Sequence, residues 1–163
     1  METKMNKTAS YIEEAIQVLI VPLRGQNIVI PQSIISEVIP VPEVNGGIDE
    51  NNWLRGAIEW RGKSVPLVSL ELLCQSDDTE SFTRTRRVAI VRGINQQEGA
   101  EFYAIEVHSI PHPVRLTKLD IQPTDDEREC EMYQQSVKAS GVFAQIINFD
   151  LLEEKIHAKL QDT

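Results

Sequence analysis

The chain has 163 residues, of which 41% are hydrophobic and 25% are charged, a balance typical of globular domains and without the signature of disorder. Its 16 Lys and Arg residues against 25 Asp and Glu residues give a net charge of −9, which disfavours nucleic-acid phosphates and anionic membranes as partners. The length is enough for one ordinary domain or for two small, tightly packed units.

The N-terminal segment and the cysteines indicate the compartment. The first sustained apolar run, Val18–Val21, ends at Pro22 and is far shorter than the roughly 18 apolar residues that span a bilayer. We expect no secretory signal ahead of the fold. The two cysteines, Cys74 and Cys130, lack Cys-x-x-Cys spacing. We therefore expect a cytoplasmic protein whose cysteines are free thiols in a reducing environment.

Hydrophobic alternation predicts mainly β-structure in the first half of the chain. Hairpins are expected around Arg24–Asn27 and around Arg61–Lys63. Two Arg-Gly pairs, which begin at Arg55 and Arg61, interrupt the apolar pattern, and we interpret both as hairpin bends. A short helix is expected to follow Ser69, whose hydroxyl can cap it. The strands expected beside these turns are Gln17–Leu23, Ile28–Ile30, Ala57–Trp60 and Ser64–Val68.

The second half predicts a similar set of elements. Arg86–Gly93 and Ala100–Val107 are expected to form a third hairpin, and Asn148–Leu160 a closing helix whose one face carries Leu152, Ile156 and Leu160. Proline has no N–H to donate. We therefore expect Pro22 and Pro66 to lie where their strands lack a partner on one side.

Two pairs of segments indicate an internal repeat. "VLIV" at Val18 resembles "VAIV" at Val88, and "VPLVSLELL" at Val65 resembles "AQIINFDLL" at Ala144. The second pair shares its apolar positions, a residue able to cap a helix and a final Leu-Leu. We expect one 1–163 domain made of two small β-barrel-like halves, 17–75 and 84–154, with 155–163 as the end of the C-terminal helix and the tail.

The residue inventory does not indicate an enzyme. His108 and His112 have a ligand-like spacing, but Pro111 and Pro113 forbid the continuous helix that such a pair needs. The acidic run Thr124–Glu131 lacks the glycine turn of a calcium loop, and no phosphate-loop or nucleophile-elbow motif occurs. We expect no catalytic residue, no cofactor and no metal site.

The stretch "RGAIEWRGKSVPLVSLELL" resembles the signature of the CheW-like domain family, the coupling proteins of bacterial chemosensory arrays. The positions in register are Gly56, Arg61, Gly62, Pro66 and Leu70, and "IINFDLLEE" resembles the closing strand and helix of the family. The resemblance covers about Val18 to Glu154. It implies two five-stranded SH3-like barrels around a shared hydrophobic interior.

The resemblance also implies a function and a set of contact residues. Family members are non-catalytic adaptors that bridge the cytoplasmic tips of chemoreceptors to the regulatory domain of a histidine kinase. Carried over by position, the partner-binding residues are Ile35, Glu37, Gly56, Arg61 and Ile110. Arg61 is the first choice, because a guanidinium can form paired hydrogen bonds with a carboxylate. Pairing of Arg61 with an acid of its own chain is an equally good interpretation. For Ile35 and Ile110 the alternative is a place in the core, which is the commoner fate of isoleucine.

Departures from the family pattern point to a divergent member. Glu59 stands where an Asn is usual, Trp60 replaces a leucine, and Ser69 replaces an Asp cap. The chain therefore resembles coupling proteins such as those of type IV pilus (twitching motility) systems. Two alternatives stay open: a small-barrel nucleic-acid binder that uses Arg84, Arg86 and Arg87, and a hydrolase that uses the acidic residues 125–131.

Overall fold

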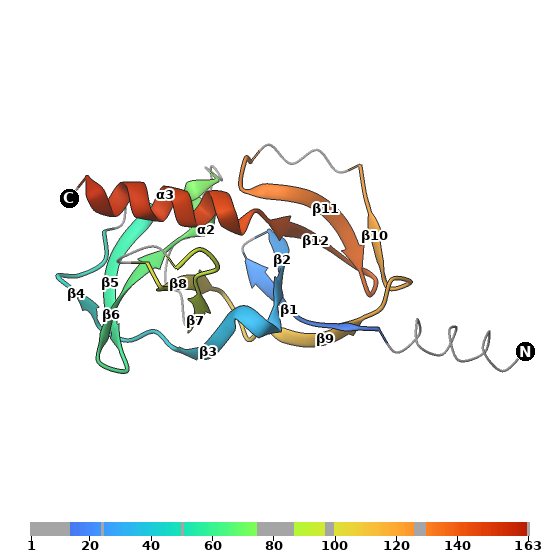
Figure 1. The fold of residues 1–163 in the computed structure, drawn as a ribbon, viewed down its shortest axis with the longest axis horizontal. Helices are drawn as coiled ribbons and strands as arrows, with labels where there is room; N and C mark the ends of the chain where they lie inside the picture. Colours follow the sequence, from blue (N-terminus) through green and yellow to red (C-terminus); the bar gives the residue numbers. More distant parts are fainter. Residues whose placement is uncertain are drawn as a thin grey trace, which may run out of the picture.

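Within the residues that the structure describes, the fold consists of two six-stranded sheets, two α-helices and one 3-10 helix (Figure 1). The computed structural model describes residues 14–23, 25–49, 51–74, 87–96, 100–125 and 130–162. The expected basic residues Arg84 and Arg86, most of the linker 74–83, and residues 126–129 of the acidic run lie outside these ranges. Arg87 is half-buried at the start of a strand.

Sheet A contains strands from both ends of the chain, in the order β10-β11-β12-β2-β1-β9. Its strands are β1 (Ile16–Leu23), β2 (Gln26–Pro31), β9 (His112–Leu116), β10 (Ile121–Pro123), β11 (Tyr133–Ala139) and β12 (Val142–Ile147). Helix α3 (Phe149–Gln161) follows β12 and extends along the molecule to the C-terminus (Figure 1). No helix in the described ranges has both the length and the apolar character needed to cross a membrane.

Sheet B contains the middle of the chain, in the order β3-β7-β8-β6-β5-β4. Its strands are β3 (Ile35–Pro40), β4 (Val44–Asn45), β5 (Leu54–Trp60), β6 (Lys63–Val68), β7 (Arg87–Arg92) and β8 (Phe102–Val107). The 3-10 helix η1 (Gln32–Ile34) precedes β3, and the four-residue helix α2 (Leu70–Leu73) follows β6.

The strand orders confirm the internal repeat but change its boundaries. Sheet A and sheet B have the same plan, with β1 in the place of β7 and β12 in the place of β6. The sheets are not the consecutive halves 17–75 and 84–154, because each half gives its first hairpin to the other sheet. The β1–β2 hairpin pairs with β9 and β12, whereas β7–β8 pairs with β3 and β6. Each sheet also has six strands instead of five.

Three hydrophobic clusters account for the stability of this arrangement. The largest lies between the sheets, with buried residues such as Val21 and Ile30 from sheet A and Val68 and Ile105 from sheet B. One smaller cluster lies within sheet B and another within sheet A. Burial of apolar surface at about 25 cal/mol per Å² is the main force that holds the sheets together. The shared hydrophobic interior is thus present as expected.

Side-chain hydrogen bonds cap the N-termini of the two α-helices, as the sequence predicts. The Leu72 N–H donates to Ser69 Oγ at 3.2 Å, and the Leu151 N–H donates to Asn148 Oδ1 at 3.1 Å. These bonds satisfy amides that the first turn of a helix leaves without a partner. Leu152 and Ile156 on α3 are fully buried.

Pro22 in β1 and Pro66 in β6 each lie outside the part of the strand that pairs with its second neighbour, β9 or β8. The N–H that each proline lacks therefore costs no hydrogen bond between strands on that side. Pairing of β1 with β9 spans Ile16 to Ile20, and pairing of β6 with β8 spans Leu67 and Val68.

Two expectations for the loops and cysteines are wrong. Arg55-Gly56 is a bulge within β5, where the register shifts between Leu54 and Gly56, and only Arg61-Gly62 is a hairpin turn. Cys74 and Cys130 form a disulfide instead of two free thiols. They lie 56 residues apart in the chain, so sequence spacing gave no sign that the fold brings their Cα atoms to 5.3 Å.

Candidate protein-docking surface

The turn between β5 and β6 presents Arg61 to solvent. Arg61 and Gly62 both have positive φ, at 48° and 74°, as a two-residue hairpin turn of the I′ class requires. Glycine adopts this conformation easily, whereas an arginine does so less readily. The Arg61 side chain is 66% exposed. The backbone of the hairpin therefore holds a guanidinium outward at the end of sheet B.

Glu37, on edge strand β3, reaches this turn across the concave side of sheet B. Its Oε2 accepts a hydrogen bond from Trp60 Nε1 at 2.8 Å and lies 3.4 Å from the Arg61 guanidinium. Strands β3 and β5 are separated by three strands in the sheet order, so this contact shows that sheet B curls until its two sides approach. Two of the predicted contact residues, Glu37 and Arg61, thus form one ion pair.

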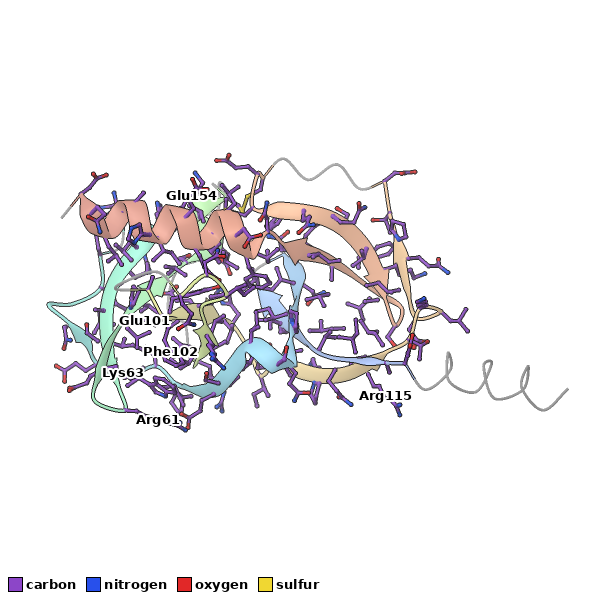
Figure 2. All side chains as sticks on the ribbon, viewed as in Figure 1. Arg61, Lys63, Glu101, Phe102, Arg115 and Glu154 are labelled. Atoms are coloured by element: carbon purple, nitrogen blue, oxygen red, sulfur yellow. A yellow bond between two sulfur atoms is a disulfide. The ribbon has the colours of Figure 1, made fainter. Side chains whose placement is uncertain are left out.

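Aromatic rings support the charged groups at this end of the sheet. The Arg61 guanidinium lies 4.8 Å from the centre of the Trp60 ring, and Lys63 Nζ lies 4.7 Å from the centre of the Phe102 ring. The two rings contact each other, with centroids 5.1 Å apart and a tilt of 53°. Cation–π contacts of this kind restrict the side-chain rotamers without neutralising the charges. Figure 2 shows Arg61, Lys63 and Phe102 gathered at this end of the molecule.

We call Glu37, Trp60, Arg61, Lys63 and Phe102 the hairpin-end surface. It combines two cations and one carboxylate over a largely buried aromatic pair. Such a surface suits hydrogen bonding to carboxylates and carbonyl groups of a protein partner. Within the described ranges, no group of three or more His, Cys, Asp or Glu side chains is placed to hold a metal ion.

The other three predicted contact residues lie on separate elements. Ile35 begins β3 and is half-buried against the core between the sheets. Gly56 lies at the β5 bulge with φ of 134°, where an added Cβ would come within 2.7 Å of Val44 Cγ1. Backbone geometry therefore accounts for this glycine. Ile110 lies between β8 and β9 and is 61% exposed, so it is not a core residue.

Sequence reasoning missed three members of the hairpin-end surface. Trp60 departs from the family pattern, and neither Lys63 nor Phe102 is among the positions that carry the resemblance. Trp60 and Lys63 are paired across the β5–β6 hairpin, which the predicted turn could have indicated. Phe102 comes from β8, and no local signal connects it to the turn.

Two buried carboxylates hold the frame behind this surface. Arg55 Nε donates to Glu106 Oε1 at 3.0 Å, with both side chains almost fully buried. Glu153 on α3 accepts from the backbone N–H groups of Ile94 and Asn95 and from the Tyr103 hydroxyl. Burial, and secondarily the Glu153 charge, raises the pKa of Tyr103 well above its usual value, so the phenol stays protonated.

The histidines are placed differently from a ligand pair. His108 Nε2 lies 2.8 Å from Glu71 Oε1 on α2, whereas His112 lies in β9 opposite Ile20 of β1. The contact of His108 with Glu71 joins the segment after β8 to the short helix.

Comparison with known proteins identifies the family. The profile of the CheW-like domain family matches residues 17–156. The fold is similar to the crystal structure of the scaffolding protein TtCheW from Thermoanaerobacter tengcongensis, with a TM-score of 0.64 at 15% sequence identity over 83% of this chain and 85% of that chain. No curated protein sequence matches the chain. The family match spans most of the chain and agrees with the fold, so the protein belongs to the CheW-like domain family.

Proposed function

We propose that this protein is a non-catalytic adaptor that couples the cytoplasmic tips of chemoreceptors to the regulatory domain of a chemosensory histidine kinase. Its family consists of chemosensory scaffolds, and a cytoplasmic location follows from the proposed role. The observation that carries the proposal is the exposed Arg61 guanidinium, at a position that matches the family pattern, held by Trp60 and Glu37.

The arrangement of Arg61 is suited to a partner more than to its own chain. The Arg61–Glu37 pair is long for an ion pair and largely exposed, so it contributes little to folding. The indole beneath the guanidinium and the carboxylate beside it restrict its rotamers, which reduces the entropy lost when a partner binds. The side chain is therefore organised before binding occurs.

The departures from the family pattern contribute to this surface. Trp60 supplies both the indole N–H that binds Glu37 and the ring beneath Arg61, neither of which a leucine could provide. We therefore propose that the receptor partner differs from that of standard chemotaxis couplers and belongs to a divergent system, such as one that controls type IV pili.

Binding measurements test the adaptor role. Titration calorimetry of the full chain with a receptor-tip fragment and with the kinase regulatory domain should give dissociation constants in the micromolar range, about −8 kcal/mol. The Arg61→Ala variant should bind the receptor tip about tenfold or more weakly and bind the kinase domain with unchanged affinity. If the parent protein binds neither the receptor tip nor the kinase domain, the adaptor role is refuted.

A matched control separates the specific contact from net charge. Arg115→Ala removes the same charge from an exposed position on β9 of sheet A (Figure 2). It should leave both affinities within about twofold. Equal losses in the two variants would show that receptor binding responds to overall charge and not to the hairpin-end surface. Receptor tips from flagellar and pilus systems, compared in the same titration, test the choice of system.

A further inference from the structure

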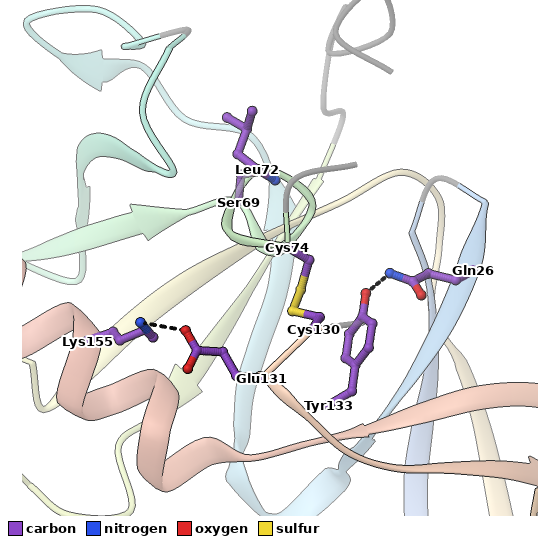
Figure 3. The surroundings of a disulfide bond; sticks show 8 residues. All are labelled: Gln26, Ser69, Leu72, Cys74, Cys130, Glu131, Tyr133 and Lys155. Atoms are coloured by element: carbon purple, nitrogen blue, oxygen red, sulfur yellow. Dashed lines mark hydrogen bonds and ion pairs between the residues drawn. A yellow bond between two sulfur atoms is a disulfide. The ribbon is translucent and has the colours of Figure 1, made fainter. Parts of the chain in front are cut away.

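The Cys74–Cys130 disulfide joins the two sheets through one short helix (Figure 3). Cys74 is the C-cap of α2, which follows β6 of sheet B. Cys130 lies just before β11 of sheet A. The Cα atoms are 5.3 Å apart although 56 residues separate the two cysteines in the chain. The bond therefore crosses between the two repeats and closes a long loop.

Noncovalent contacts also hold the segment that contains Cys130. Glu131 Oε1 lies 3.1 Å from Lys155 Nζ on α3, and the Gln26 side chain donates to the Tyr133 hydroxyl (Figure 3). The Asn148 N–H donates to the carbonyl of Met132, which is fully buried. These contacts join the segment to α3, β2 and the start of the helix without the disulfide. The fold therefore does not depend on the covalent bond to keep this segment in place.

Helix α2, at the other end of the bond, is held by Leu70, which is buried in the core, and by the contact of Glu71 with His108. It has only four residues, and a single helical turn is marginal without tertiary support. The amides of Leu73 and Cys74 donate to the carbonyls of Ser69 and Leu70, and the disulfide fixes the residue that ends the turn. Both cysteines are only half-buried. The bond thus lies at a partly exposed position and constrains the residue that ends a four-residue helix.

We propose that the Cys74–Cys130 bond is a reversible redox lock that fixes α2 against the start of β11. A dithiol reductant attacks one sulfur, the S–S bond breaks, and a mixed disulfide forms with the reductant. The second thiol of the reductant then displaces the remaining cysteine. The reductant ends as a disulfide, and its two electrons and two protons remain on Cys74 and Cys130 as thiols. The lock does not depend on the adaptor role, which the binding titrations test separately.

Thermal unfolding with and without a dithiol reductant tests the lock. Reduction of the native protein should lower Tm by about 5–10 °C, because the unfolded chain regains the freedom of a long loop. The double variant Cys74→Ser, Cys130→Ser contains no thiol, since the chain has only two cysteines. It should unfold at the Tm of the reduced native protein, and reductant should not change that Tm. An equal Tm for oxidised and reduced native protein would overturn the lock.

Alkylation and hydrogen exchange locate the effect. Before reduction the native protein should take up no iodoacetamide, and after reduction it should take up two equivalents. Reduction should accelerate amide exchange of Leu73 and Cys74 about tenfold or more beyond the acceleration of the β5–β6 hairpin amides, which respond only to the loss of global stability. Alkylation of unreduced protein, or uniform acceleration at all amides, would contradict a local lock.

Reversibility has its own readout. In glutathione buffers without denaturant, the fraction of closed bond should change across graded ratios of reduced to oxidised glutathione and return when the ratio is restored. A bond that stays closed at every ratio is a permanent structural crosslink, and that result would also overturn the proposal.

Discussion

The units β5-β6-α2 and β11-β12-α3 share their strand pairing, bulge and turn but have very different side chains. An offset of 79 residues relates equivalent positions in the two units. Leu54 pairs with Val68 in the first unit, and the equivalent Tyr133 pairs with Ile147 in the second. Both first strands have a bulge at the same place, between Leu54 and Gly56 in one and between Tyr133 and Gln135 in the other. Both turns have two residues with positive φ: Arg61 and Gly62 in the first unit, Ser140 and Gly141 in the second.

The side chains then give the two units different properties. In sheet B, the bulge position Arg55 forms a buried ion pair with Glu106, whereas the equivalent positions in sheet A are Gln134 and Pro31. Gln134 and Pro31 line an apolar hollow of about 660 Å³. The two helices differ as well, since α2 has four residues and a disulfide and α3 has 13 residues and a buried face. The two sheets thus share one strand plan. Their side chains place a buried ion pair in sheet B and an apolar hollow at the equivalent place in sheet A.

The largest expected effect on stability is at Arg55, the bulge residue of sheet B, compared with Gln134, the bulge residue of sheet A. Arg55→Ala removes the guanidinium that faces the buried Glu106 carboxylate, and should lower the free energy of unfolding by about 3–5 kcal/mol. Gln134→Ala at the equivalent position of sheet A should cost about 1 kcal/mol or less. Urea titrations of both variants measure the difference. Similar losses would mean that the two bulges are energetically equivalent despite their side chains.

The buried phenol of sheet B should make stability depend on pH at the alkaline end. The native Tyr103 keeps its proton because burial raises its pKa, while the unfolded chain releases that proton above about pH 10. Stability from Tyr103 is therefore complete below pH 10 and declines by about 1.4 kcal/mol per pH unit above it. Denaturant titrations at pH 9, 10 and 11 should show this slope. Tyr103→Phe should remove it, and an unchanged slope in that variant would exclude Tyr103 as its source.

The helix caps should respond alike in the two units. Ser69→Ala and Asn148→Ala each remove one side-chain acceptor from a first-turn amide, at a cost of about 1 kcal/mol. Threonine at position 69 and serine at position 148 should recover most of the loss. Circular dichroism melts of the four variants provide the measurement. A much larger loss at one cap would show that tertiary packing, and not capping, dominates there.

The smallest effect is expected at the two turns. Arg61→Ala should change the free energy of unfolding by less than about 0.5 kcal/mol, because its pairing with Glu37 is largely exposed. Ser140→Ala, at the equivalent turn position, should change stability as little. A loss above about 1 kcal/mol in Arg61→Ala would assign the arginine mainly to folding and weaken its proposed role in receptor binding.

Local patterns in the sequence were sufficient to predict much of the fold. The hairpins, the Ser69 and Asn148 caps and the buried face of α3 depend on residues close in the chain, and the structure confirms them. The exchange of first hairpins could not be predicted, since either pairing of the two repeats satisfies the same hydrophobic pattern. The Arg55-Gly56 sequence predicts a bend as readily as a bulge, because a glycine with positive φ suits both.

The candidate site was predictable only in part. Glu37 and Arg61 came from the family resemblance, and the structure brings them together. Phe102 and Lys63 join them through contacts between β8 and the β5–β6 hairpin, which no local pattern encodes. The Cys74–Cys130 bond likewise depends on tertiary proximity, and the expected reducing compartment argued against it.

The exchanged hairpins mean that neither repeat is an autonomous folding unit. Cutting the chain between α2 and β7 would leave each fragment with a sheet that lacks two inner strands, because β1–β2 belongs to one sheet and β7–β8 to the other. The fragments could regain complete sheets only by associating with one another, because each contains a hairpin that completes the other's sheet. The two repeats thus behave as an obligate heterodimer within a single polypeptide.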